Sequence, residues 1–119
     1  TQLTSFSEAD MQATQQTTLS MAESVQHLAK MAYAAGVDGT ISAPGEAALI
    51  RDVTADNFLR ITPGIRLAGD AADDQARITT PAVARESGAT GLVVGRSITK
   101  AQAPVAAYQR VMAEWGDKI

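Results

Sequence analysis

The chain has 119 residues, of which 45% are apolar, and this is enough for one domain with a buried core. Its net charge is −3 and its basic residues are scattered, which argues against binding nucleic acid through a basic face. The sequence contains no run of about 18 apolar residues that would span a membrane. It also contains no cysteine, which excludes disulfides, thiolate metal sites and thiol catalysis. We therefore expect an acidic enzyme of the cytoplasm.

The first predicted elements are the end of a strand and a helix. Residues 1–5 are typical of a strand already under way, and because no methionine precedes them we expect a piece of a longer protein. From Ser20 to Ala35, apolar residues recur in steps of three and four, which predicts a helix. Ser20 and Glu23 have the spacing of a capping box, and Gly36 is suited to end the helix.

The next two predicted units each begin with a short strand. The segment 37–43 predicts a strand, after which Pro44 begins a helix that continues to about Asp52. A second strand is expected over 58–65, and a long polar loop follows over 66–79. This order of strand, helix and strand is typical of parallel sheets.

The last predicted elements repeat the alternation. A short helix that begins at Pro81 is expected within 80–88, with Thr80 as its N-cap. The segment 90–98 contains the run Leu92-Val93-Val94, which predicts a strand buried on both faces. A final helix is expected over 103–115. Four strand–helix units are half of an eight-stranded β/α barrel, whose full length is about 250 residues. Because a half barrel leaves edge strands unpaired, we expect another segment or a second copy to cover them.

Two arginines, Arg66 and Arg96, follow two successive predicted strands. The carboxyl ends of parallel strands form the active face of a β/α barrel. A guanidinium group suits a phosphate, and a glycine such as Gly95 lets backbone N–H groups approach the ligand. We therefore interpret Arg96 as a phosphate-binding residue. For Arg66, an ion pair with Asp70 is an equally good interpretation.

Other polar residues have ordinary structural explanations. Gln75 lies in the long polar loop, where a glutamine usually faces solvent. The acidic residues of that loop lack the spacing of a calcium-binding loop, so we favour a solvated surface for them. Hydroxyl groups at Thr4, Ser5 and Ser7 suit helix caps, and His27 falls on the polar side of its helix.

A lysine at a strand end beside a carboxylate would be expected in a site that moves protons. The three lysines of this sequence lie on or beside predicted helices instead. The chain by itself therefore predicts a phosphate-binding site without a catalytic constellation.

A series of motifs runs through nearly the whole sequence. In chain order they are Leu3-Thr4-Ser5, Ala35-Gly36-Val37-Asp38-Gly39, Thr62-Pro63-Gly64-Ile65-Arg66, Gly69-Asp70, Asp74-Gln75, Thr80-Pro81 and Val93-Val94-Gly95-Arg96. This series resembles the C-terminal half of bacterial orotidine 5′-phosphate decarboxylase. Each motif alone is a weak signal. Together, in this order and at this spacing, they are specific and cover nearly the whole chain.

The resemblance implies a TIM barrel that works as a homodimer and converts orotidine 5′-monophosphate to UMP and carbon dioxide without metal or organic cofactor. Residues 1–119 would then be the C-terminal (βα)4 half of one barrel domain, from the end of strand five to helix eight. The chain would need the N-terminal half of the same barrel, because the family's array of lysine and aspartate residues lies there. No catalytic residue is therefore expected in this chain.

The resemblance assigns substrate-binding roles to six residues: Thr4, Pro63, Arg66, Gln75, Gly95 and Arg96. The two arginines and the glycine backbone would hold the phosphate, and the glutamine would contact both phosphate and pyrimidine. The threonine would contact the pyrimidine edge, and the proline would line the base pocket.

Two alternatives stay open. One is another barrel enzyme for ribose phosphates, such as a hexulose-phosphate synthase or a pentose-phosphate epimerase, although the motifs at 62–66 and 74–75 argue against it. The other is a non-catalytic half barrel that dimerises and binds phosphate.

Overall fold

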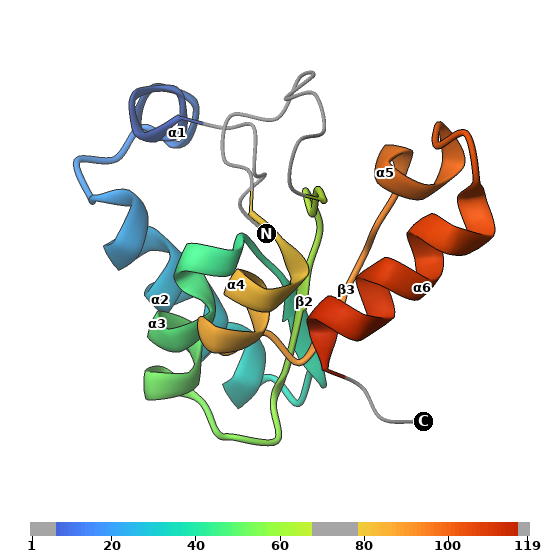
Figure 1. Ribbon diagram of the computed structural model, residues 1–119. Helices are drawn as coiled ribbons and strands as arrows, with labels where there is room; N and C mark the ends of the chain where they lie inside the picture. The colour runs from blue at the N-terminus through green and yellow to red at the C-terminus, as the bar shows by residue number, and fades with distance from the viewer. Residues whose placement is uncertain (1–6, 68–78, 117–119) are drawn as a thin grey trace.

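The computed structural model describes residues 7–67 and 79–116 (Figure 1). Its helices are α1 (Glu8–Gln15), α2 (Met21–Ala34), α3 (Ala47–Val53), α4 (Pro81–Glu86), α5 (Arg96–Thr99) and α6 (Pro104–Trp115), with a 3₁₀ turn η1 (Pro44–Glu46). Its strands are β1 (Gly39–Ile41), β2 (Leu59–Thr62) and β3 (Gly91–Leu92). The predicted first strand, residues 1–5, lies outside the described ranges. Within those ranges, no helix is long and apolar enough to cross a bilayer.

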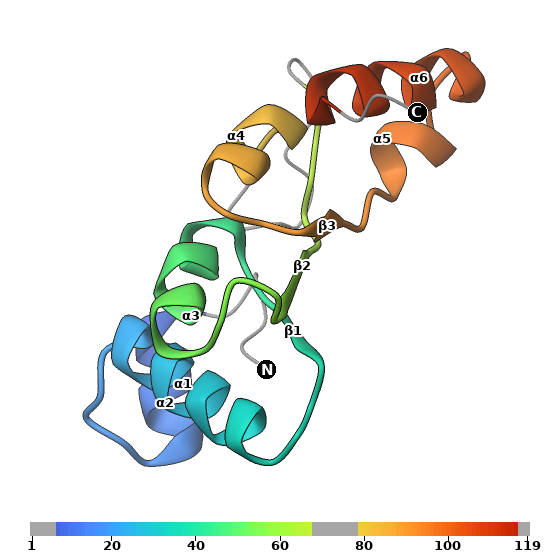
Figure 2. The ribbon, with the colours of Figure 1, turned by 90° about the horizontal axis from the view of Figure 1, so that it is seen from below.

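The three strands form one parallel sheet in the order β1-β2-β3. Ile61 lies opposite Ile41 on one side and Gly91 on the other. Figure 2 shows α2, α3 and α4 on one side of this sheet. The predicted alternation of parallel strands and crossover helices is therefore confirmed for the described residues.

The two faces of the sheet differ in their burial because side chains alternate along each strand. Arg60 and Thr62 lie on the helix-covered face and are 4% and 0% exposed. Leu59 lies on the opposite face, as do Ile41 and Val93 by register, and these three side chains are 47%, 48% and 51% exposed. We call these three residues the open apolar face of the sheet.

Helix α2 forms as its sequence predicts. The Ser20 side chain accepts a hydrogen bond from the Glu23 backbone N–H, and the Glu23 side chain accepts one from the Ser20 backbone N–H, so the capping box is confirmed. Gly36 has φ +87°, the left-handed conformation expected just after the helix. The exposed position of His27 is also confirmed.

The helix predicted from Pro44 is confirmed, with its first turn tightened into η1 before α3. The first core cluster joins α2 and α3 to the start of β2 through Val25, Ala29, Ile50 and Phe58. Burial of these apolar side chains holds the crossover helices against the sheet.

Helix α4 begins as predicted, since the Thr80 hydroxyl accepts a hydrogen bond from the Val83 N–H. A second core cluster contains Ile65, Ala84 and Ala89. Trp115 of α6 packs against this cluster, and the Arg85 guanidinium lies 4.9 Å from the centroid of its ring. The final helix predicted over 103–115 is thereby confirmed and anchored to α4.

The strand predicted at Leu92-Val93-Val94, within the segment 90–98, is wrong in two respects. The ladder contains only Gly91 and Leu92, because Gly95 takes a backbone conformation of φ −104° and ψ −99° and α5 starts at the next residue. Val93 is half exposed and not buried on both faces, because no described helix covers its side of the sheet.

Helix α1 was not predicted from the sequence. This helix is capped by Ser7, whose hydroxyl accepts a hydrogen bond from the Asp10 N–H, so the capping role favoured for this serine is confirmed. The sequence of α1 has little apolar periodicity, and Met11 is its one buried residue. The cap was therefore the available signal, and it was not enough to predict a helix.

Candidate functional site

The candidate site begins where β2 ends. Pro63 directly follows the strand, and Gly64 has φ +76°, a conformation that allows the chain to turn sharply. Ile65 then forms an isolated parallel bridge with Thr79, and the Arg66 N–H donates to the Thr79 carbonyl oxygen over 2.9 Å. The turn therefore has a fixed place at the carboxyl edge of the sheet.

The second part of the site follows β3. The Val93 N–H donates to the Thr62 carbonyl oxygen over 2.9 Å, which continues the pairing of the two strands to their ends. The chain then reaches Gly95, which is exposed; among residues 7–67 and 79–116, no atom lies within 4 Å of the place that a Cβ would occupy. The described residues therefore leave the backbone of Gly95 open, and its predicted role in holding a ligand stays a prediction.

A hydrogen bond joins these two strand ends beyond the sheet. The Leu67 N–H donates to the Ser97 hydroxyl oxygen over 3.2 Å, and both residues are buried. Since Leu67 follows Arg66 and Ser97 follows Arg96, the backbone segments that carry the two arginines lie side by side. Arg66 is 5% exposed, and Arg96 is partly buried.

Ser97 was not predicted from the sequence as a site residue. Its signal was its position directly after Arg96 in the motif Val93-Val94-Gly95-Arg96-Ser97. A serine after a strand can form many different hydrogen bonds, however, and only the tertiary structure identifies the Leu67 N–H as its partner.

Two of the six predicted site residues, Thr4 and Gln75, lie outside the described residues. The same holds for the acidic residues Asp70, Asp73 and Asp74. In the ranges 7–67 and 79–116, no group of three or more histidine, aspartate or glutamate side chains could hold a metal ion. The four remaining residues, Pro63, Arg66, Gly95 and Arg96, all lie at the carboxyl edge of β2 and β3.

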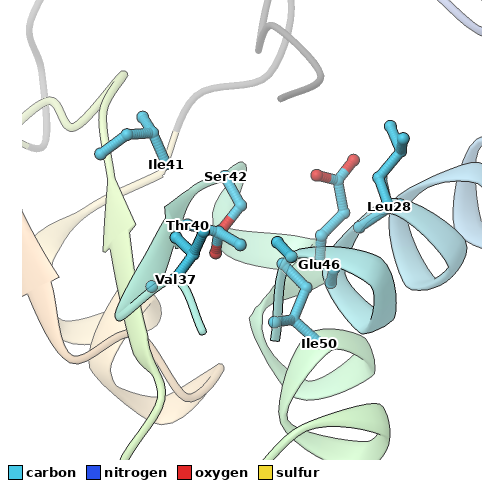
Figure 3. A pocket seen from close by; sticks show the side chains of 11 residues that line it. Leu28, Val37, Thr40, Ile41, Ser42, Glu46 and Ile50 are labelled. Carbon is cyan, nitrogen blue, oxygen red and sulfur yellow. The ribbon is translucent and has the colours of Figure 1, made fainter. Parts of the chain in front are cut away.

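A cavity of about 230 Å³ lies elsewhere, between α2 and the edge strand β1 (Figure 3). Figure 3 shows Thr40, Ser42 and Glu46 among its lining residues. Glu46 is 4% exposed, and its carboxylate accepts a hydrogen bond from the Ala43 N–H. The cavity is next to the edge of β1 that no described strand covers, and it does not include the arginine-bearing strand ends.

The family model described as "Orotidine 5'-phosphate decarboxylase / HUMPS family" matches residues 1–111. The chain belongs to this family. The resemblance seen in the sequence motifs is therefore confirmed over nearly the whole chain.

Curated relatives of the chain are named orotidine 5′-phosphate decarboxylase and are about twice as long as this chain. The orotidine 5′-phosphate decarboxylase of Oenococcus oeni is 55% identical over 115 residues, which are 97% of this chain and 50% of that protein. The protein of the same name from Listeria monocytogenes is 53% identical over 115 residues, which are 49% of its length. The chain thus spans about half the length of the curated relatives it matches.

A solved structure also matches nearly all of this chain over about half of its own length. The crystal structure of orotidine 5′-phosphate decarboxylase from Lactobacillus acidophilus matches with a TM-score of 0.80 and 41% identity, over 98% of this chain and 47% of that one. The predicted fold class is confirmed: this family member has the parallel strands and outer helices of half a TIM barrel.

Proposed function

We propose that this chain is the C-terminal half of an orotidine 5′-phosphate decarboxylase, which converts orotidine 5′-monophosphate to UMP and carbon dioxide. In this proposal the chain supplies the phosphate site and part of the pyrimidine site. The observation that carries it is the hydrogen bond between Leu67 and Ser97, because it places the backbones of Arg66 and Arg96 side by side in a member of this family.

The phosphate site consists of the two arginines and the backbone of Gly95. A guanidinium group donates paired hydrogen bonds in one plane, which suits the oxygens of a phosphate. Burial of Arg66 supports a role in binding, since a charge removed from water strengthens its interaction with an anion. The open space beside Gly95 leaves room for the phosphate oxygens.

In this proposal the pyrimidine site lies next to the phosphate site. Pro63 directly follows β2, at the same edge of the sheet as Arg66. The family resemblance assigns Thr4 to the pyrimidine edge and Gln75 to both the base and the phosphate. These two assignments rest on sequence motifs alone.

The chemistry requires the other half of the barrel. Loss of carbon dioxide leaves a carbanion on the pyrimidine ring, so the enzyme must stabilise charge that develops in the transition state. The lysine and aspartate residues that do this in the family belong to the N-terminal half. Binding energy from the remote phosphate supports the reaction by fixing the substrate in place.

The open apolar face supports the assignment of residues 1–119 to strand five through helix eight of one barrel. Ile41, Leu59 and Val93 are each about half exposed on the side of the sheet that would face the interior of a closed barrel. Covering them would remove their apolar surface from water, which is favourable at about 25 cal/mol per Å². We therefore propose the N-terminal half of the same barrel as the partner that covers this face. The complete enzyme is proposed to be a cytoplasmic homodimer that uses no cofactor.

The proposal is tested by rebuilding the barrel. The half of the Oenococcus oeni relative that this chain does not match is joined to the amino end of the chain, giving one polypeptide, the rebuilt barrel. We expect it to release carbon dioxide from orotidine 5′-monophosphate, while each half alone does not. A rebuilt barrel that folds and binds UMP without decarboxylating the substrate would leave only the non-catalytic phosphate binder. Formation of a hexulose phosphate from ribulose 5-phosphate and formaldehyde would identify the synthase instead.

A further inference from the structure

The hydroxyl group of Ser97 lies where the two candidate phosphate-binding segments meet. Its oxygen accepts a hydrogen bond of 3.2 Å from the Leu67 N–H. Ser97 is 7% exposed and Leu67 is 5% exposed, so the bond is shielded from water. A buried N–H that loses its partner costs free energy, so this hydroxyl favours one position of the Leu67 backbone.

This bond lies beyond the last pairing of the strands. The Val93 N–H and the Thr62 carbonyl oxygen form that last pair. After it, the β2 side turns at Gly64, while the β3 side turns at Gly95 and enters α5. The two backbones follow different paths from this point, and the sheet no longer fixes the distance between them.

The position of the bond relates it directly to the two arginines. Arg66 precedes the donor residue by one position, and Arg96 precedes the acceptor residue by one position. The Thr79 carbonyl oxygen accepts from the Arg66 N–H but belongs to neither strand end, so it does not set the spacing between the arginines. The hydroxyl of Ser97 does, because it connects one segment to the other.

We propose that Ser97 is a positioning residue for phosphate binding, which keeps the backbone of Arg66 beside that of Arg96 so that both guanidinium groups meet one phosphate. This inference rests on the proposed function, because it concerns the same phosphate site. Ser97 acts through the Leu67 N–H and needs no contact with the ligand itself. A threonine retains the hydroxyl at this place, whereas an alanine removes it.

The experiment compares variants of the rebuilt barrel by titration calorimetry with UMP and with uridine. The dissociation constant for uridine divided by that for UMP measures how much the phosphate adds to binding. We expect S97A to lower this ratio about three- to tenfold, the value of one hydrogen bond, and to leave the affinity for uridine unchanged. S97T retains the hydroxyl and should therefore keep the wild-type ratio. T99A is the matched control, since Thr99 is an exposed hydroxyl residue of the same helix.

The outcomes separate this inference from the proposed function. A wild-type barrel that binds UMP no better than uridine has no phosphate site, and the proposed function fails with it. A wild-type barrel with a large ratio that S97A leaves unchanged overturns the positioning role alone. Equal losses for UMP and uridine also overturn it, because they indicate a general structural defect. Should S97A not fold, S97C takes its place, and its weaker acceptor should lower the ratio by an intermediate factor.

Discussion

The guanidinium group of Arg60 donates from Nε to the Gly88 carbonyl oxygen over 2.8 Å, and from Nη1 to the Phe58 carbonyl oxygen over 2.8 Å. The first bond joins β2 to the turn between α4 and β3, and the side chain is 4% exposed. Burial lowers the pKa of Arg60, and the nearby charge of Arg51 lowers it further. The carbonyl oxygens satisfy this buried cation, so it serves the fold at the opposite end of β2 from the candidate site.

Replacing Arg60 should therefore destabilise the rebuilt barrel. We expect R60M to lower the free energy of unfolding by about 3 kcal/mol, because buried carbonyl oxygens lose a charged donor. Urea denaturation followed by circular dichroism measures the change. R110M is the control: Arg110 is half exposed and pairs with Glu114 four residues on, so its loss should cost less than about 0.5 kcal/mol. Equal effects of the two variants would contradict the structural role of Arg60.

Gly39 should tolerate no side chain. A Cβ at this position would lie 2.4 Å from the Leu59 Cβ and 2.6 Å from the Leu59 carbonyl oxygen. Because part of the obstacle is backbone, β1 and β2 would have to move apart. We expect G39A to lower the free energy of unfolding by about 1–3 kcal/mol in the rebuilt barrel. G45A, where no atom lies within 4 Å of a Cβ, should change it by less than about 0.5 kcal/mol.

The Thr62 hydroxyl is a buried polar group with no hydrogen-bond partner among the described residues. Valine has nearly the same shape and replaces the hydroxyl with a methyl group. We expect T62V to raise the free energy of unfolding by about 1 kcal/mol, since it removes an unsatisfied polar atom. T62S keeps the hydroxyl and loses the methyl group, so it should lower the stability. A loss of stability in T62V would show that the hydroxyl has a partner.

The capping box of α2 should weaken in acid. Backbone and side-chain hydrogen bonds from Ser20 lower the pKa of Glu23 in the folded chain. Its stabilising effect is therefore complete above the pKa of an unfolded glutamate, about 4.3, and is lost as the pH falls through the lower folded value. The protection factors of the amides in the first turn of α2, which are their exchange rates relative to the unfolded chain at the same pH, should fall in that range. E23Q should show no such pH dependence, because its side chain does not titrate.

Arg96 should contribute to binding through the phosphate alone. In the rebuilt barrel we expect R96A to weaken the binding of UMP by about 2–3 kcal/mol, since a charged hydrogen-bond donor is lost. The affinity for uridine should stay the same. R85A is the control, because Arg85 lies over the Trp115 ring and away from the strand ends. Unchanged UMP affinity in R96A would remove this arginine from the site.

Local sequence signals predicted the elements whose ends are fixed by nearby residues. The capping box at Ser20 and Glu23, the cap at Thr80 and the left-handed Gly36 depend on contacts within four residues, so the sequence shows them directly. The strand predicted at Leu92-Val93-Val94 extends past the observed β3, because this run has strand propensity whether or not a neighbouring strand pairs with it. Pairing is a tertiary property: its last residue pair is Thr62 with Leu92, and its last hydrogen bond runs from the Val93 N–H to the Thr62 carbonyl oxygen.

For the candidate site, the sequence alone determined which residues follow the strands: Pro63, Arg66, Gly95 and Arg96. It also determined the family, because the order and spacing of motifs are properties of the chain itself. Only the tertiary structure decided that Leu67 and Ser97 meet across 30 residues of sequence. The reason is physical: a hydrogen bond between distant residues exists only after the sheet has brought the ends of β2 and β3 together.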